Sequence, residues 1–248
     1  MSRLHRPKAG FWIRLCVAIL YPLDGLLFKI QWRHLDRIPP PSAGGVIIAI
    51  NHVSMTDTVL MARFVWQSGR IPRFLIKSGV FSLFGLGTIM RGAKQIPVYR
   101  GTKDASESLK DAVTALESGE AVVIYPEGTV TSDPDQWPMQ AKTGIARLVL
   151  LAPHTPVVPV GQWGAQRRRG QPWFTKLGRR TAAASVGEPM DLSRYAGREP
   201  DADTLREITD VIMAEVRAQV ALVRNEDAPV VFFKPIRNYV DKARRKAG

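Results

Sequence analysis

The chain has 248 residues, of which 45% are apolar and 23% are charged, and this globular composition excludes wholesale disorder. Its 35 Lys and Arg residues outnumber 22 Asp and Glu residues, and the net charge of +13 indicates an anionic partner such as nucleic acid, a membrane surface or a phosphorylated metabolite. The single cysteine excludes an internal disulfide and a cysteine metal cluster, and four scattered histidines do not suggest a zinc site.

The N-terminal segment, residues 1–35, begins basic and then turns apolar. A secretory signal is disfavoured because no small-residue cleavage pattern follows the apolar part. A spanning helix is disfavoured because Arg14, Pro22, Asp24 and Lys29 interrupt the stretch. Aromatic and basic residues mixed with aliphatic ones favour a helical segment that lies in the membrane interface. The alternative is a helical hairpin packed on the protein's own core.

From residue 45, short apolar runs alternate with helical patterns. The runs predicted as strands are "GGVIIAI", "RFLIK", "KQIPVY", "AVVIYP", "TPVVPV" and "TAAASVG". Helices are predicted over residues 54–67, 104–118, 141–152 and 203–224. This alternation predicts a single α/β domain over residues 36–225, with a mostly parallel or mixed central sheet flanked by helices. A basic C-terminal tail, residues 226–248, completes the predicted organisation.

The stretch "INHVSMTD" follows the first predicted strand and contains His52 and Asp57. Two residues five apart on one helix point about 140° away from each other, so a turn must intervene if these side chains meet. Ser54 and Asp57 resemble a capping box, with Ser54 as N-cap and Asp57 at the third helical position. The carboxylate would then reach back to one imidazole nitrogen and leave the other as a base. The alternative is that Asp57 only caps the helix while His52 bonds to backbone.

A substrate hydroxyl is the expected target of this base, because the chain lacks the Gly-x-Ser-x-Gly elbow of a serine nucleophile. Ligand sites in α/β folds gather beyond the carboxyl ends of strands, and "VVIYPEGT" ends such a strand. Several cations flank the neighbouring strands and are candidates for holding an anionic substrate: Lys77, Arg91, Lys94, Arg100 and Lys142. The alternative for each of them is a solvated surface charge.

These motifs together resemble the glycerolipid acyltransferases. "NHVSMTD" is similar to their Asn-His and Asp signature, and "YPEGT" is similar to their Glu-Gly-Thr motif. Further similarities are Lys77, the strand-ending Arg100 of "PVYR", the segment "AKTG" and the late strand "VVPV". The resemblance spans roughly residues 45–162 and is nearest to bacterial enzymes of the 1-acyl-sn-glycerol-3-phosphate (lysophosphatidic acid) acyltransferase type.

The resemblance implies that His52 deprotonates the acceptor hydroxyl, which attacks the thioester of acyl-CoA or acyl carrier protein, while Asp57 orients His52. The product would be phosphatidic acid, a step of phospholipid biosynthesis, with no cofactor and no metal required. It further implies that a second set of residues holds the acceptor phosphate or shapes the site: Lys77, Arg100, Glu127, Gly128, Thr129 and Lys142.

One departure from the family pattern concerns the acceptor. The family continues Glu-Gly-Thr with Arg-Ser, whereas this chain has Val130 and Thr131. An arginine there would be a bidentate phosphate donor, so its replacement leaves lysophospholipid or glycolipid hydroxyls open as acceptors. Two other functions stay open at this point: a non-catalytic basic protein that binds membranes or nucleic acid, and a thioesterase that uses the same base on water.

Two further segments suggest a membrane surface. Residues 167–180 carry six Arg and Lys residues interleaved with Trp173 and Phe174, a pattern that suits an anionic leaflet or nucleic acid equally. The N-terminal segment favours the membrane, so a peripheral position on the cytoplasmic face of the cell membrane is expected and no nucleic-acid partner. Residues 79–92 are predicted to form a lipid-facing lip or an acyl tunnel wall, the alternative being a buried helix and loop.

Overall fold

A seven-stranded sheet forms the centre of the computed structural model, which describes residues 9–99, 105–166 and 180–235. The strands are β1 (Phe28–Arg33), β2 (Val46–Ile50), β3 (Pro72–Lys77), β4 (Ile96–Val98), β5 (Ala121–Ile124), β6 (Val157–Trp163) and β7 (Arg180–Val186). They lie in the order β1-β7-β6-β2-β5-β3-β4, and only the β6–β7 pair is antiparallel. The prediction of an α/β domain with a mixed sheet is confirmed.

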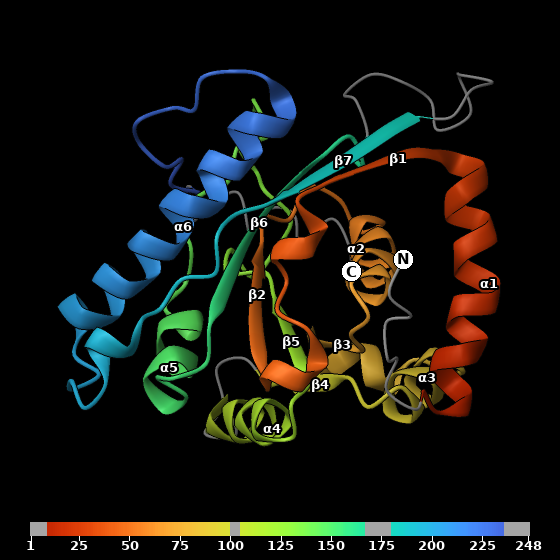
Figure 1. The fold of residues 1–248 in the computed structure, drawn as a ribbon, viewed down its shortest axis with the longest axis horizontal. Coiled ribbons are helices and arrows are strands. Elements are labelled where there is room, and N and C mark those ends of the chain that lie inside the picture. Colours follow the sequence, from red (N-terminus) through yellow and green to blue (C-terminus); the bar gives the residue numbers. More distant parts are fainter. Residues whose placement is uncertain (1–8, 100–104, 167–179, 236–248) are drawn as a thin grey trace.

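Helices cover both faces of this sheet (Figure 1). They are α1 (Phe11–Leu27), α2 (Asp57–Gln67), α3 (Leu86–Gly92), α4 (Ala105–Glu117), α5 (Gly144–Leu151) and α6 (Ala202–Arg224). On one face α4, α5 and α6 pack together, and on the other α2 packs on the sheet with α1 outside it and α3 beside α1. The four helices predicted from the sequence are all present, each within three residues of its expected ends.

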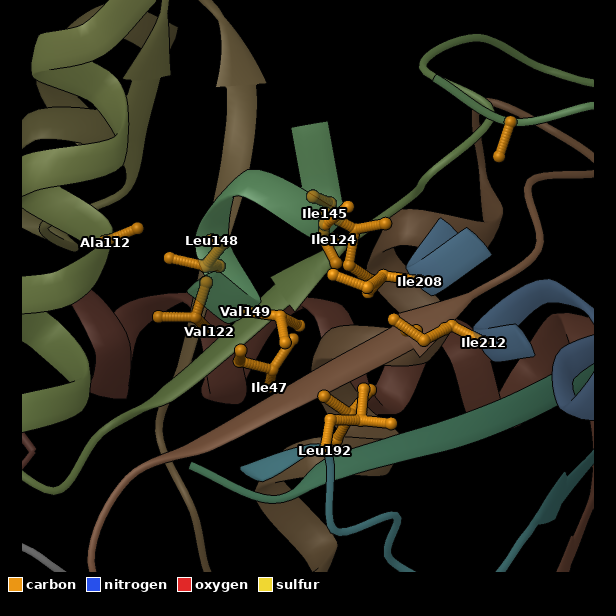
Figure 2. Packing of buried hydrophobic residues seen from close by; sticks show 14 of the residues in the cluster. Ile47, Ala112, Val122, Ile124, Ile145, Leu148, Val149, Leu192, Ile208 and Ile212 are labelled. Atoms are coloured by element: carbon orange, nitrogen blue, oxygen red, sulfur yellow. The ribbon is translucent and has the colours of Figure 1, made fainter. Parts of the chain in front are cut away.

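Strand β2 contributes side chains to the hydrophobic clusters on both faces of the sheet. All five of its residues are fully buried, as its uninterrupted apolar run predicts. Ile47 and Ala49 face the cluster built with α4, α5 and α6 (Figure 2), whereas Ile48 and Ile50 face the cluster built with α2. Burying one such side chain contributes about 1.5–3 kcal/mol. The loop that follows β2 therefore starts from a rigid platform.

The structure corrects the prediction that residues 1–35 are helical throughout. Residues 28–33 form β1, an edge strand that pairs in parallel with β7. Phe28, Ile30 and Trp32 alternate along it with more exposed polar residues, which is the two-residue period of a half-buried strand. Within residues 9–35, the part of this segment that the structure describes, α1 leads directly into the strand, and no helical hairpin is formed there. The predicted domain boundaries stay a prediction.

Helix α1 packs on the protein and also exposes apolar side chains. The ring of Trp12 lies so close to Gly92 of α3 that a Cβ there would overlap it, and the guanidinium of Arg63 on α2 donates to the carbonyl of Tyr21. Helix α1, the loop before α3 and the first residue of α3 also carry exposed apolar residues: Phe11, Ile19, Leu23, Leu26, Leu27, Leu83, Phe84 and Leu86. In the part of the chain that the structure describes, no helix is both long and apolar enough to cross a bilayer.

Candidate active site

The carboxyl ends of four neighbouring strands, β6, β2, β5 and β3, meet at one edge of the sheet. His52 follows β2, Glu127 follows β5, and Lys77 ends β3. Gln162 lies near the end of β6 on the other side of β2. The sheet therefore brings together two motifs that lie 75 residues apart in the sequence, His52 and Glu127.

His52 and Asp57 form a buried pair. Nδ1 of His52 lies 3.1 Å from each carboxylate oxygen of Asp57. Oδ2 of Asp57 also accepts hydrogen bonds from the backbone N–H groups of Val53, at 2.8 Å, and Ser54, at 2.9 Å. Asp57 is fully buried, whereas the His52 side chain is 11% exposed. Because a carboxylate only accepts, Nδ1 carries the hydrogen and Nε2 is free to act as a base.

The local geometry differs from the predicted capping box. Helix α2 begins at Asp57 with Thr56 as its N-cap, so Ser54 is not the cap and Asp57 is the first helical residue rather than the third. A turn closed by the Asp57 N–H on the carbonyl of Ser54 precedes the helix, and the Ser54 hydroxyl accepts from the N–H of Thr56 at 3.2 Å. The carboxylate still reaches back over this turn, as expected, and so meets the imidazole.

Glu127 supports the backbone of the histidine rather than facing a substrate. One of its carboxylate oxygens accepts from the N–H of His52 at 2.8 Å and the other from the N–H of Met139 at 3.0 Å. The residue is 1% exposed. Burial raises the pKa of Glu127 from its ordinary 4.5 to about 8, although the two amide hydrogen bonds oppose the shift. This geometry limits the expected role of Glu127 to shaping the site.

Three hydrogen bonds that the sequence did not reveal join Asn51, directly after β2, to Gln162 near the end of β6. The side chain of Asn51 accepts from the N–H of Gln162 at 2.8 Å and donates to its carbonyl at 3.1 Å. The Gln162 amide in turn donates to the carbonyl of Asn51 at 2.7 Å. Both residues are buried. The available signal was a polar residue at the end of each of two apolar strands, which is where a site is expected.

The segment after "PEGT" is tied to the histidine by Thr131. Its N–H donates to the carbonyl of His52 at 2.8 Å, and its hydroxyl donates to the carbonyl of Trp137 at 2.8 Å. The guanidinium of Arg224, at the end of α6, lies 4.1 Å from the ring centre of Trp137 and 4.0 Å from that of Trp163. Thr131, which the sequence presented only as part of a departure from the family pattern, thus anchors the loop that carries His52.

The other candidate residues divide into three groups. Gly128 has a φ of +71°, which favours glycine, and a Cβ there would lie 3.3–3.4 Å from the end of the Lys142 side chain. Three candidates are exposed at this edge of the sheet: Lys77, Thr129 and Lys142. The ammonium of Lys142 lies over the turn that follows β5, because it is close to Gly128. Arg100 lies outside the described residues, as do Lys176 and the rest of the basic segment 167–179.

An apolar cavity of about 150 Å³ lies between the N-terminal helix α1 and the elements α2, α3 and β3. Helices α1, α2 and α3 and strand β3 line it, with Leu20, Val59 and Met90 among the contributing side chains. Thr58, the neighbour of Asp57, also lines it, as does Phe74. The cavity therefore extends from the N-terminal helix to the first turn of α2, where Thr58 follows Asp57 in the chain.

Comparison with known proteins agrees with this geometry. The sequence model of the Acyltransferase family matches residues 29–163, more than half of the chain. The chain belongs to the Acyltransferase family. The matched residues include both the His52–Asp57 loop and the Glu127 turn. Acyltransferase chemistry, which the motifs predicted, is thereby confirmed at the level of the family.

Two individual proteins are also similar. The 1-acyl-sn-glycerol-3-phosphate acyltransferase of Bacillus subtilis (strain 168) is 24% identical over 180 residues, which cover 71% of this chain and 82% of the relative. The crystal structure of the 1-acyl-sn-glycerophosphate (LPA) acyltransferase PlsC from Thermotoga maritima has a TM-score of 0.61 at 18% identity, covering 88% of this chain and 81% of that one. This structural similarity shows that the chain and PlsC have the same fold.

The raised pKa of Glu127 gives a pH-dependent prediction. The folded state keeps a proton on Glu127 up to a pKa of about 8, whereas the unfolded state loses it near 4.5. The folded state therefore binds more protons between these values, and stability falls as pH rises through this window. Glu127→Gln cannot titrate, so its melting temperature minus that of wild type should become more positive from pH 5 to pH 8, as measured by thermal unfolding.

Comparing differences across pH removes any constant cost of placing an amide NH₂ near a backbone N–H. Glu188→Gln is the matched control, because the Glu188 side chain is 74% exposed on the surface. Its difference from wild type should stay flat over the same range. A flat difference for Glu127→Gln as well would show that Glu127 is ionised in the folded protein throughout.

Proposed function

We propose that the protein transfers a fatty acyl group from acyl-CoA or acyl carrier protein to the free hydroxyl of 1-acylglycerol-3-phosphate, forming phosphatidic acid. The observation that carries this proposal is the contact of His52 Nδ1 with both oxygens of Asp57, at the sheet edge where the Acyltransferase motifs meet. The names of the two similar proteins support the choice of lysophosphatidate as acceptor. No cofactor or metal takes part in the proposed reaction.

The proposed chemistry needs one base and two positioned substrates. Nε2 of His52 takes the proton of the acceptor hydroxyl as its oxygen forms a bond to the thioester carbonyl carbon. The carbon–sulfur bond then breaks, and the imidazolium returns the proton to the leaving thiolate. Asp57 holds Nδ1–H and stabilises the imidazolium between these steps. The base contributes about 10²–10⁴-fold, and the rest of the acceleration comes from positioning.

The apolar cavity gives the acyl chain a place in this scheme. Its walls include Leu20, Val59 and Met90, together with Thr58, which follows Asp57 in the chain. An acyl chain in it would bury methylene groups, each contributing about 0.8 kcal/mol, and would fix the thioester near His52. Met90 belongs to residues 79–92, so this segment serves as a tunnel wall in the proposal. Its exposed Leu83 and Phe84 serve as the lip.

A lysine takes the place of the missing arginine in the proposed acceptor site. The Lys142 side chain lies against Gly128 in the turn after β5, and Val130 leaves no guanidinium there. Lys142→Gln should therefore raise the KM for lysophosphatidate by roughly tenfold, the effect of about 1.4 kcal/mol, with little change in kcat. Lys110→Gln, at an exposed position on α4, is the control. An unchanged KM for Lys142→Gln would assign the phosphate to other groups.

A peripheral position on the cytoplasmic face of the cell membrane completes the proposal. Its support is the exposed apolar side chains of α1, including Phe11 and Leu26, together with Phe84 in the loop before α3. Both lie next to elements that line the cavity, so a lipid substrate would enter from the bilayer surface. The net charge of +13 favours an anionic leaflet.

The direct test is an acyl-transfer assay with purified protein, labelled acyl-CoA and lysophosphatidic acid. The proposal expects labelled phosphatidic acid and little release of free fatty acid. Fatty acid release that does not depend on the acceptor would identify a thioesterase instead. Salt-sensitive nucleic-acid binding without transfer to any lysolipid, from acyl-CoA or acyl carrier protein, would favour the non-catalytic alternative.

A further inference from the structure

The phenol ring of Tyr125 lies against the imidazole of His52. The two ring centres are 4.2 Å apart and the planes are inclined by 23°. Phe74 lies nearly parallel to the same phenol, at 6.2 Å and 18°. The second torsion of a histidine has a broad preference and needs neighbours to define it. The stacked ring of Tyr125 therefore fixes the plane in which both nitrogens of His52 point.

The hydroxyl of Tyr125 is buried next to polar groups of the site. Its oxygen is buried and makes no hydrogen bond of good geometry among the described residues, and the same is true of the side-chain oxygen of Gln162. The groups that act on this phenol are Asp57, Thr58 and Gln162. Burial and the charge of Asp57 hold the pKa of Tyr125 well above its usual range, so the hydroxyl keeps its proton. A buried donor thus stands beside the carboxylate of the catalytic pair.

The charge on Asp57 has few other partners. The carboxylate is fully buried and accepts from Nδ1 of His52 and from the backbone N–H groups of Val53 and Ser54. Among the described titratable groups, those facing the imidazole are Asp57 from α2 and Tyr125 from the segment directly after β5, while Glu127 contacts only the backbone N–H of His52. A further donor to Asp57 would stabilise its charge and weaken its pull on the imidazole proton.

We propose that Tyr125 is a positioning residue of the His52–Asp57 pair: its ring fixes the imidazole plane, and the dipole of its buried hydroxyl, close to the Asp57 carboxylate, limits how strongly His52 holds a proton. This inference rests on the proposed function only where it concerns the rate of acyl transfer. The protonation of His52 can be measured in the protein without any substrate.

The test follows the ring protons of His52 by NMR as pH is changed, in the wild type and in Tyr125→Phe. The chain has only four histidines, and loss of a signal in His52→Gln assigns the relevant one. Tyr125→Phe keeps the stacked ring and removes the hydroxyl, so the titration midpoint of His52 should move to higher pH by roughly 0.5–1 unit. The acid limb of the acyl-transfer rate should move in the same direction.

Tyr195→Phe is the matched control, because Tyr195 is also buried and its hydroxyl donates to Glu207 at 2.8 Å, away from the site. It should leave the His52 titration unchanged. Tyr125→Leu removes the stack and should lower kcat by at least about tenfold. An unshifted His52 midpoint in folded Tyr125→Phe would overturn the inference, because the Tyr125 hydroxyl would then have no effect on the protonation of His52. Absence of acyl transfer in the wild type, with the midpoint shifted as expected, would instead reject the proposed function.

Discussion

His52→Ala should abolish acyl transfer while leaving the fold intact, with kcat falling by at least about 10³-fold. The physical reason is that the variant lacks any base near the acceptor hydroxyl, whereas the substrates still bind. The fold should survive the loss of the side chain, because the loop is also held through the histidine backbone: Glu127 accepts from its N–H and Thr131 donates to its carbonyl. The measurement is the initial rate with labelled donor, beside circular dichroism and thermal unfolding.

The control is His154→Ala, which removes an exposed imidazole after α5 and should leave the rate unchanged. Normal turnover by a folded His52→Ala variant would show that His52 is not the general base. A parallel loss of rate and of the unfolding transition would point to structure instead, and the backbone hydrogen bonds at His52 argue against that outcome.

Asp57→Asn should lower kcat severely but less than His52→Ala, by about 10²-fold. An amide keeps one acceptor oxygen for the backbone N–H groups of Val53 and Ser54, but it no longer carries the charge that stabilises the imidazolium. The acid limb of the pH–rate profile should move to lower pH at the same time, because the protonated histidine loses its counter-charge. Steady-state rates from pH 5 to pH 9 measure both effects.

Asp201→Ala separates this electrostatic effect from helix capping. Asp201 is the N-cap of α6 and accepts from the N–H of Thr204 at 2.7 Å, so alanine at this position costs a capping interaction of about 1 kcal/mol far from the site. Stability should fall in that variant while the rate and its pH dependence stay as in the wild type. Equal rates for Asp57→Asn and wild type would mean that Asp57 only caps α2.

The fold could largely be predicted because its main elements carry strong local patterns. The uninterrupted apolar run of β2 and the helical stripe of α6 leave few alternatives once strands and helices alternate. Strand β1 was missed although Phe28, Ile30 and Trp32 alternate with polar residues, because the apolar stretch before it suggested one continuous helical segment. Its pairing with β7 is a contact between distant segments that no local pattern encodes.

The site was predictable to the extent that its chemistry lies within single motifs. The meeting of His52 and Asp57 followed from spacing, since a turn had to intervene, although the helix starts two residues later than a Ser54 cap would place it. The contact of Glu127 with the backbone of His52 could not be predicted from the sequence. A conspicuous carboxylate suggested a ligand contact, whereas burial and two amide partners make it a support for the histidine backbone.

Tyr125 illustrates the remaining gap. In the sequence it is one more apolar residue at the end of β5, and only the parallel pairing of β5 with β2 brings its ring against the imidazole. Asn51 and Gln162 are similar, because their mutual hydrogen bonds join strands that lie far apart in the chain. Residues of this kind decide how the base is held, and they become visible when the strand order is known.

The central claim is that the His52–Asp57 pair acylates the free hydroxyl of lysophosphatidate. The most direct measurement offers the wild type and His52→Ala an equimolar mixture of lysophosphatidate, lysophosphatidylcholine and lysophosphatidylethanolamine with one acyl-CoA, and identifies the products by mass spectrometry. We expect phosphatidic acid as the dominant new lipid in the wild type and none above background in the variant. A product formed from a different lysolipid, or phosphatidic acid formed equally by both proteins, would contradict the account.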